Sequence, residues 1–168
     1  MSSIEQHRMA APRSVRCAVV TVSDTRTVET DTSGALIRER LERAGHAVVF
    51  YAIVPDEREE IGRLVDELVQ RPDCDAVLLN GGTGIARRDV TYEAIAERIE
   101  KRLDGFGELF RWLSYREIGT AAMLSRALAG VYRGRIVIAM PGSTGAVRLA
   151  MDELVLPELA HLVFEARK

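Results

Sequence analysis

The 168-residue sequence has few aromatic residues and little net charge, and each shortage excludes a class of protein. Aromatic residues make up 5% of the chain and hydrophobic residues 47%, so the core must be mainly aliphatic and the protein globular. The net charge of −2 gives no general attraction to nucleic acid or to an anionic membrane, so we expect neither as a partner. Any anionic ligand must therefore be bound by a local site.

Cysteines and long apolar runs are also scarce. Cys17 and Cys74 each adjoin apolar residues and lack metal-ligand spacing, so we expect two buried, reduced thiols. No apolar run approaches membrane-spanning length, and residues 1–14 lack the apolar stretch of a signal peptide. We expect a cytoplasmic protein with a flexible N-terminal tail over residues 1–14 and one domain over residues 15–168.

Strand and helix patterns alternate along this domain. Near-continuous apolar runs, typical of strands covered on both faces, occur at residues 15–22, 47–54, 76–79 and 135–140. Helices are expected before Gly45, over Ile61–Val69, from Thr91 to about Arg102, over Glu108–Tyr115, from Thr144 to about Leu154 and from Pro157 onward. Residues 105–107, Gly-Phe-Gly, are expected to separate two helices, and residues 118–131 have no clear assignment. Repeated strand–helix units predict a single three-layer α/β domain with a mostly parallel sheet.

The most informative segment is residues 75–93, DAVLLNGGTGIARRDVTYE, in which a strand breaks into the loop Gly81-Gly82-Thr83-Gly84. Glycines let backbone N–H groups crowd around an anion, and the helix that follows, with Thr91 as its expected N-cap, adds positive charge. The loop is neither a P-loop nor a dinucleotide fingerprint, because Gly-Lys-Ser/Thr and the G-x-G-x-x-G spacing are both absent. A tight strand-to-helix turn is the alternative interpretation.

Charged side chains directly follow the glycines. Arg87 and Arg88 are suited to neutralise phosphate oxygens, and Asp89 is suited to hold a divalent cation or to orient a nucleophile. Because a plain turn needs none of these three side chains, they favour an anion-binding site.

Ligands of parallel α/β sheets bind beyond the carboxyl ends of the strands, which directs attention to the loops there. These loops contain Ser23, Asp24, Asp31, Thr32, Ser33, Asp56, Glu57, Asp89, Pro141, Gly142, Ser143 and Thr144. Each polar residue also has a simpler explanation, since Asp24 can close a turn and most of the others can cap a helix. Their convergence at one sheet edge, with carboxylates beside an anion-binding loop, predicts a phosphate-handling active site.

Seven motifs occur in order along the chain: Val-Ser-Asp (22–24), Asp-Thr-Ser-Gly (31–34), Ile-Val-Pro-Asp-Glu (53–57), Gly-Gly-Thr-Gly-x-x-x-Arg-Asp-Val-Thr (81–91), Gly-Phe-Gly-Glu (105–108), Leu-Ser-Arg (124–126) and Met-Pro-Gly-Ser (140–143). Together they resemble the MoaB/MogA family of molybdenum cofactor biosynthesis proteins, over about residues 14–165. Gly-Phe-Gly-Glu and Met-Pro-Gly-Ser favour the MoaB branch of this family. Tyr92 and Asn80 replace a proline and a threonine common in the family, and neither change removes a proposed catalytic group.

The resemblance implies an enzyme that adenylylates molybdopterin, in which the terminal phosphate of molybdopterin attacks the α-phosphate of ATP and pyrophosphate leaves. Mg²⁺ is the expected cofactor, and Asp56 and Asp89 match the two aspartates that would bind it and align the phosphates. The expected nucleotide- and phosphate-binding residues are Gly81, Gly82, Thr83, Gly84, Arg88, Pro141, Gly142 and Ser143. The expected substrate-binding residues are Ser23, Asp24, Asp31, Ser33, Ser114, Ser125 and Arg126.

The resemblance also implies partners and leaves alternatives open. The chain is expected to form a homo-oligomer, either a trimer or a dimer of trimers, and other cofactor-assembly enzymes are further candidate partners. A carrier that binds molybdopterin or nucleotide without catalysis would share the same motifs. A generic nucleotide- or pterin-binding module is a third interpretation.

Overall fold

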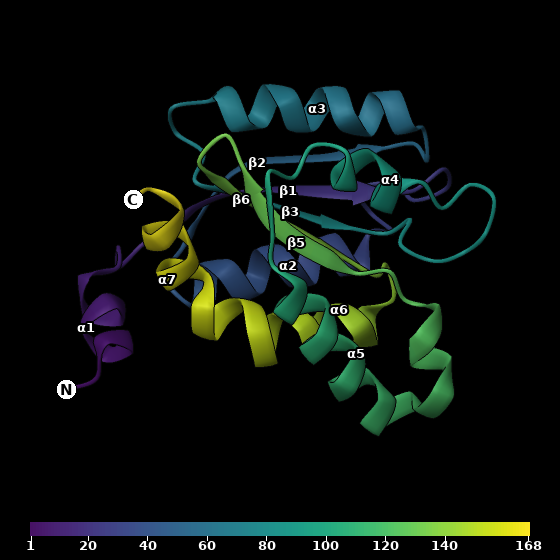
Figure 1. The fold of residues 1–168 in the computed structure, drawn as a ribbon. Coiled ribbons are helices and arrows are strands. Elements are labelled where there is room, and N and C mark those ends of the chain that lie inside the picture. The colour runs from purple at the N-terminus through teal and green to yellow at the C-terminus, as the bar shows by residue number, and fades with distance from the viewer.

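In the computed structural model, which describes residues 1–168, a six-stranded sheet lies between two layers of helices (Figure 1). The strands lie in the order β2 (Ala47–Val54), β1 (Arg16–Val22), β3 (Ala76–Asn80), β6 (Arg135–Met140), β5 (Leu128–Tyr132) and β4 (Lys101–Arg102). The first four are mutually parallel, and β5 pairs antiparallel with both β6 and β4. The expected three-layer domain with a mostly parallel sheet is confirmed.

Helices cover both faces of the sheet. One face carries α3 (Arg58–Gln70) and α4 (Thr91–Ala96), and the other carries α2 (Thr32–Arg43), α5 (Asp104–Ile118), α6 (Thr144–Ala150) and α7 (Leu156–Ala166) (Figure 1). A 3-10 helix, η1 (Gly119–Leu124), follows α5, and a π-helical segment, η2 (Met151–Val155), joins α6 to α7. None of the helices combines the length and apolar character that a membrane span requires.

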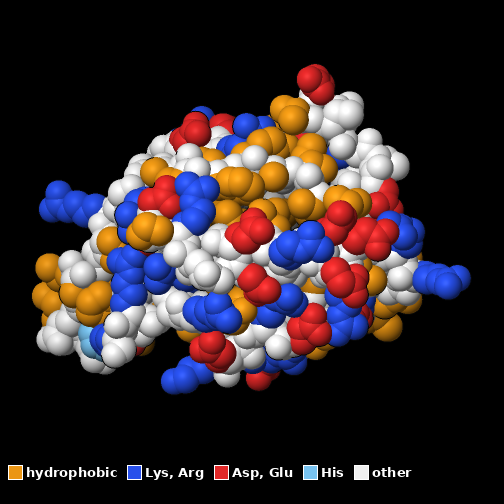
Figure 2. Space-filling view, turned by 90° about the horizontal axis from the view of Figure 1, so that it is seen from above, with side chains coloured by type: hydrophobic (Ala, Val, Ile, Leu, Met, Phe, Trp, Pro, Cys, Tyr) orange, Lys and Arg blue, Asp and Glu red, His pale blue; other side chains and the backbone are white.

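Each face of the sheet has its own aliphatic core, because successive side chains of a strand point to opposite faces. In β1, Val19 packs in the cluster of α2, α5, α6 and α7, while Val20 packs in the cluster of α3 and α4. The two cysteines are free and buried as expected, one in each cluster, and burial raises the pKa of both thiols. On the α3 face, acidic and basic side chains are interspersed, in keeping with the small net charge (Figure 2).

Two boundaries between α4 and α5 differ from the expectation. Helix α4 ends at Ala96 rather than near Arg102, because Lys101 and Arg102 form β4 against β5. This pairing requires a glycine in β5, since a Cβ at Gly130 would lie 2.5 Å from the carbonyl oxygen of Lys101. Helix α5 begins at Asp104 and includes Gly107, where a Cβ would lie 2.9 Å from the carbonyl oxygen of Ala127. Gly107 therefore permits close packing of the helix, and residues 105–107 lie within α5 and do not separate two helices.

The remaining unassigned stretch, residues 118–131, contains the end of α5, η1 and most of β5. At the N-terminus, where a flexible tail was expected, Ser3–Ala10 form helix α1. Ser2 and Glu5 make a capping box at its start, with Glu5 N–H donating to Ser2 Oγ at 3.2 Å. A serine followed three residues later by a glutamate is the sequence signal from which this helix could have been predicted. Helix α1 lies beside α7 (Figure 1).

Candidate active site

The glycine loop leaves β3 at the carboxyl edge of the sheet, between the ends of β1 and β6. Gly81 and Gly82 have φ values of +97° and +71°, in the left-handed region that favours glycine. A Cβ at Gly81 would lie 2.3 Å from the carbonyl oxygen of Val22, so the loop packs directly on the end of β1. On its other side, Gly81 N–H donates to the carbonyl oxygen of Met140 at 3.0 Å. Both neighbouring strands therefore fix the loop.

Asp56 and Asp89 lie beside this loop. A Cβ at Gly82 would lie 3.3 Å from Asp56 Oδ1, and a Cβ at Gly84 would lie 2.7 Å from Asp89 Oδ2. Asp56 does not cap α3, because Glu57 is the N-cap residue and makes no side-chain capping bond. Asp89 Oδ2 accepts a hydrogen bond from Ala86 N–H at 2.9 Å. The simpler explanation of Asp56 as a helix cap is therefore excluded, and both carboxylates border the glycines.

A third carboxylate, that of Asp24 after β1, completes an acidic group at the same edge. Asp24 Oδ1 accepts a hydrogen bond from Asp56 N–H at 3.0 Å. Burial raises the pKa of Asp56, and the negative charges of Asp24 and Asp89 raise it further. The hydrogen bond from Arg88 instead lowers the pKa of Asp24. The acidic group therefore has more negative charge than its surroundings neutralise.

The side chain of Arg88 does not point to a free phosphate position. Its Nε donates to Asp24 Oδ2 at 2.6 Å, and its Nη2 donates to Glu57 Oε1 at 2.9 Å. Carboxylates from two other loops thus already bind the guanidinium of Arg88, and its phosphate-binding role stays a prediction. Arg88 ties the glycine loop to the loops after β1 and β2.

A pocket of about 330 Å³ opens next to the glycine loop. The predicted residues that line it are Gly81, Gly82, Thr83, Gly84, Asp89, Ser114, Ser125, Pro141, Gly142 and Ser143. The structure thus brings together a residue of α5 and residues that follow β3, η1 and β6, which are far apart in the sequence. Its apolar wall comes from Phe110, Ile118, Ala121, Ala122, Leu124 and Ala146. Sequence reasoning missed this wall because it lies mostly in the stretch without a clear helical or strand pattern.

Two serine hydroxyl groups fix the second loop of the pocket, Pro141-Gly142-Ser143, by hydrogen bonds. Ser33 Oγ donates to the carbonyl oxygen of Gly142 at 2.7 Å, and Ser143 Oγ caps α6 by accepting from Ala146 N–H at 3.2 Å. A Cβ at Gly142 would lie 3.1 Å from the Cα atom of Gly81, so the two glycine-containing loops touch. Ser33 itself is fully buried. Ser33 therefore supports this loop, and its contact with substrate stays a prediction.

Asp31 likewise acts inside the protein, since its exposed fraction is 1%. It is the N-cap of α2, accepting from Gly34 N–H at 2.9 Å, as one of the sequence interpretations held. The other carboxylate oxygen accepts from Thr21 Oγ1 at 2.6 Å and from the Tyr51 hydroxyl. Burial alone would raise the pKa of Asp31, but these hydrogen bonds lower it below its ordinary value. Asp31 thus positions the loop after β1 from inside the protein, and its contact with substrate stays a prediction.

Arg126 is a second arginine whose donors are used within the protein. Its Nε donates to the carbonyl oxygen of Gly84 at 2.9 Å, and its Nη2 to that of Asp89 at 3.0 Å. Its Nη1 pairs with Glu93, one turn into α4. Arg126 thus holds both ends of the segment between Gly84 and Asp89, and its role as a phosphate partner stays a prediction.

Two smaller predictions concern residues at loop ends. Ser23 Oγ accepts from the N–H groups of Thr25 and Arg26 at 3.2 and 3.0 Å, so it stabilises the turn after β1. Thr91 is the first residue of α4 rather than its N-cap, which is Val90. Its N–H donates to the carbonyl oxygen of Gly82 at 3.0 Å, and its buried Oγ1 has no hydrogen-bond partner.

The fold and the pocket define an α/β molybdopterin-binding domain, since residues 18–161 match the family described as a probable molybdopterin binding domain. The chain is 57% identical over 167 residues to molybdenum cofactor biosynthesis protein B of Halalkalibacterium halodurans, covering 99% of this chain and 98% of the relative. It therefore belongs to the MoaB family of molybdenum cofactor biosynthesis proteins, as the resemblance indicated.

Solved structures agree with this assignment. A crystal structure of a molybdenum cofactor biosynthesis protein B has a TM-score of 0.90 and 55% identity, covering 93% of this chain and 98% of that chain. The tungsten cofactor synthesizing protein MoaB from Pyrococcus furiosus has a TM-score of 0.85 and 39% identity, covering 94% of this chain and 100% of that chain. A role in molybdenum cofactor biosynthesis follows for the present chain.

Proposed function

We propose that the protein adenylylates molybdopterin, using ATP and Mg²⁺ and releasing pyrophosphate. One observation carries the proposal: the Asp56 and Asp89 carboxylates border the glycine loop that lines the pocket of about 330 Å³. Family membership and the molybdopterin-binding domain support the choice of pterin substrate.

The reaction would join a terminal phosphate oxygen of molybdopterin to the α-phosphorus of ATP and break the bond from that phosphorus to pyrophosphate. Such a transfer needs little covalent chemistry from a protein, which must mainly align the two phosphates and offset their charge. Backbone N–H groups of the Gly81–Gly84 loop and the adjoining Pro141–Ser143 loop are suited to hold the nucleotide. Ser114 and Ser125, from the opposite wall of the pocket, are suited to contact the pterin.

The donor chemistry of the acidic group fits Mg²⁺, which prefers carboxylate oxygens and usually takes only one or two of them. Asp56 and Asp89 would hold the ion. Burial and the negative charges of Asp24 and Asp89 raise the pKa of Asp56, and a cation would offset those charges. When bound, Mg²⁺ would compensate the charge of the reacting phosphates. Asp24 would contribute to the field around the ion while it remains paired with Arg88.

Pyrophosphate release tests the proposal directly. Purified protein is incubated with ATP, Mg²⁺ and molybdopterin, and a parallel reaction omits the pterin. We expect pterin-dependent release that falls at least about a hundredfold in Asp56→Asn and in Asp89→Asn, as for the loss of a group that aligns or stabilises the transition state. Asp104→Asn is the matched control, because its carboxylate is 70% exposed and lies on the start of α5, outside the pocket.

Two outcomes would contradict the proposal in different ways. Background release together with retained pterin binding would identify a non-catalytic carrier, which the same pocket could serve. Full activity in both aspartate variants would be compatible with adenylyl transfer but would refute the catalytic roles assigned to Asp56 and Asp89.

We further propose that the protein forms a homo-oligomer, a trimer or a dimer of trimers, through α5 and η1. These elements expose large apolar side chains beside the pocket: Leu109, Trp112, Tyr115, Ile118, Met123 and Leu124, each between 48% and 74% exposed. Such a concentration of exposed apolar side chains is typical of a surface that another subunit covers.

Light scattering tests the oligomeric state and should give a mass of three or six chains for the wild type. A monomeric wild type at assay concentration would refute the proposal, and Trp112→Glu should shift an oligomer toward the monomer.

A further inference from the structure

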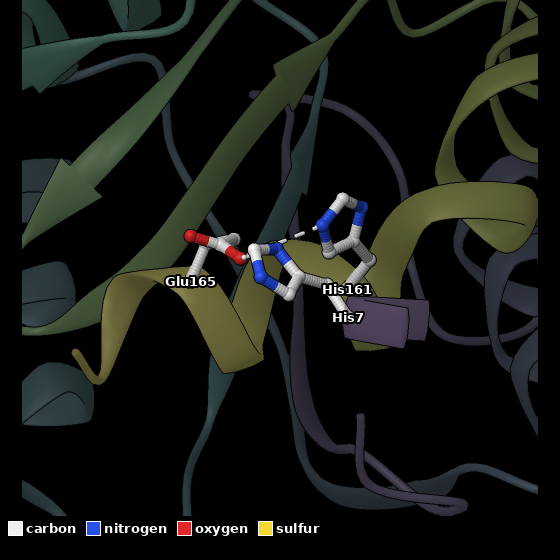
Figure 3. A group of neighbouring side chains, drawn as sticks. All are labelled: His7, His161 and Glu165. Atoms are coloured by element: carbon white, nitrogen blue, oxygen red, sulfur yellow. Dashed lines mark ion pairs between the residues drawn. The ribbon is translucent and has the colours of Figure 1, made fainter. Parts of the chain in front are cut away.

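Three side chains with metal-binding atoms meet far from the candidate active site. His7 comes from α1, and His161 and Glu165 come from α7 (Figure 3). Their ligand atoms all lie within 4.8 Å of one another. Arg167, which directly follows α7, binds Asp75, which immediately precedes β3, whereas the glycine loop follows the other end of β3. The cluster and the pocket therefore lie at opposite edges of the sheet.

The contacts of His161 leave one ring nitrogen of its imidazole available to a metal ion. His161 and Glu165 are four residues apart and thus share one face of α7. Nδ1 of His161 lies 3.0 Å from Glu158 Oε2, so a proton on Nδ1 donates to that carboxylate and leaves the Nε2 lone pair free. Nε2 then faces Glu165 Oε1 at 3.6 Å. A carboxylate behind the imidazole is the usual support of a metal-binding histidine.

His7 adds the third ligand atom from the other helix. Its Nδ1 lies 2.8 Å from the same Glu165 Oε1, so one carboxylate oxygen faces a nitrogen of each histidine. The neighbouring ion pair between Arg8 and Glu158 holds α1 in register with α7. The side chains of His7 and Glu165 are each 40% exposed, which leaves room for water at a fourth position.

We propose that His7, His161 and Glu165 bind a divalent transition-metal ion of the Zn²⁺ class, which fastens α1 to α7. Two imidazoles and one carboxylate suit Zn²⁺ at a tetrahedral site and do not suit Mg²⁺, which prefers oxygen ligands. The inference does not depend on the proposed adenylyl transfer.

Helix α1 is weakly attached to the domain, so a bound ion would strengthen its attachment. None of the eight residues of α1 is buried, so its docking gains little from the hydrophobic effect. A helix of this length is also unstable by itself in water. Apart from Arg8, its contacts with α7 include the His7 ring, 5.9 Å from the ring of Phe164. A metal ion shared by the two helices would therefore be the main fastening of this segment.

The ammonium group of Lys168 opposes metal binding at this cluster and provides a further test. Lys168 Nζ lies 2.8 Å from Glu165 Oε1 and 3.5 Å from His7 Nε2. A bound cation would have to displace this ammonium group from the shared carboxylate. Removing its charge in Lys168→Met should therefore increase the affinity for Zn²⁺, whereas the loss of a merely structural contact would not.

The experiment is a Zn²⁺ titration of the untagged full chain in competition with a chromophoric chelator. We expect one ion per chain, at least tenfold weaker binding in His7→Gln and in His161→Gln, and tighter binding in Lys168→Met. His46→Gln is the matched control, since the side chain of His46 bonds only to Val15 N–H at the start of the domain, and this variant should leave the affinity unchanged. Zn²⁺ should also slow tryptic cleavage after Arg13, which is exposed between α1 and β1, in the wild type and not in His161→Gln.

The active-site variants separate this site from the acidic group. Asp56→Asn and Asp89→Asn should retain the Zn²⁺ site in full. Binding that survives both His7→Gln and His161→Gln, or that disappears in the aspartate variants, would overturn the proposal. The absence of stoichiometric Zn²⁺ binding by the wild type would overturn it as well.

Discussion

Replacing Tyr51 by phenylalanine tests the buried support of the candidate active site. The Tyr51 hydroxyl, on β2, donates to Asp31, whose carboxylate also accepts from Thr21 Oγ1 at 2.6 Å. Phenylalanine keeps the ring and its position under the Arg38 guanidinium, 3.9 Å from the ring centroid. The substitution therefore removes one hydroxyl group from a carboxylate that is only 1% exposed and has little access to water.

The expected loss follows from the number of bonds that Asp31 keeps. A hydrogen bond to a charged group contributes about 1.5–3 kcal/mol to the free energy of unfolding. Asp31 retains Thr21, the Gly34 N–H at 2.9 Å and the Arg26 guanidinium at 3.6 Å, so the loss should fall near the middle of that range. About 2 kcal/mol corresponds to a decrease in Tm of about 4–8 °C for a chain of this size.

The effect should also depend on pH in a defined direction. The folded-state pKa of Asp31 is lowered, although burial alone would raise it, because Thr21, Tyr51 and Gly34 hydrogen-bond to the charged form. Stability from a lowered pKa is present above the unfolded-state value of 3.8 and is lost as the pH falls through the folded-state value. The Tm difference between wild type and Tyr51→Phe should be full at pH 7 and shrink below pH 3.8.

Calorimetry at several pH values measures this difference. Tyr92→Phe is the control, because its hydroxyl accepts only an exposed hydrogen bond, from Arg102 Nη2 at 3.0 Å; its effect should stay within about 0.5 kcal/mol. Equal decreases in Tm for the two variants would refute the reasoning. A Tyr51→Phe difference that is constant from neutral to acid pH would refute the role given to the Asp31 charge.

Two further predictions concern the loop and its carboxylates. Because the folded-state pKa of Asp56 is raised, its charge opposes folding at pH 7. Asp56→Asn should therefore raise Tm, although it lowers pyrophosphate release at least about a hundredfold; solvent screening of this partly exposed group limits the gain in stability to about 1 kcal/mol. The gain should disappear below pH 3.8, where the wild-type carboxyl is itself protonated, and a stability loss at pH 7 would contradict the electrostatic argument. Gly81→Ala should cost about 2 kcal/mol or more in thermal unfolding, because φ is +97° and the added Cβ would lie 2.3 Å from a backbone oxygen. Gly145→Ala, in α6 with nothing within 4 Å of its Cβ position, should instead be neutral or stabilising, and equal losses in both variants would contradict this account.

Much of the fold could be predicted because its signals are local. The parallel strands β1, β2, β3 and β6 are buried between helices and read as continuous apolar runs, so their positions follow from the sequence alone. The glycine loop and the N-caps Asp31 and Ser143 are equally local features. Strand β4 could not be predicted, because two exposed residues, Lys101 and Arg102, become a strand only when Gly130 allows them to approach β5.

The candidate site was predictable in its location but not in the orientation of its charged side chains. The rule that ligands bind at the carboxyl ends of parallel strands correctly groups the loops that carry Asp56, Asp89 and Gly142. The partners of Arg88 and Arg126, however, are Asp24 and Glu93, far away in sequence. Nothing in the chain near an arginine indicates whether a distant carboxylate will bind it before a ligand can.

The pairing of these arginines determines how the site can accept a polyphosphate. Arg88 is bound by two carboxylates and Arg126 by Glu93 and two backbone carbonyls, so of the three arginines near the loop only Arg87 makes no ion pair. A nucleotide bound as proposed would therefore meet backbone N–H groups together with the negative charges of Asp56 and Asp89. Repulsion between these carboxylates and the phosphates would oppose binding of the bare anion. A divalent cation that binds both partners turns this repulsion into attraction, so nucleotide affinity, and not only turnover, should require Mg²⁺.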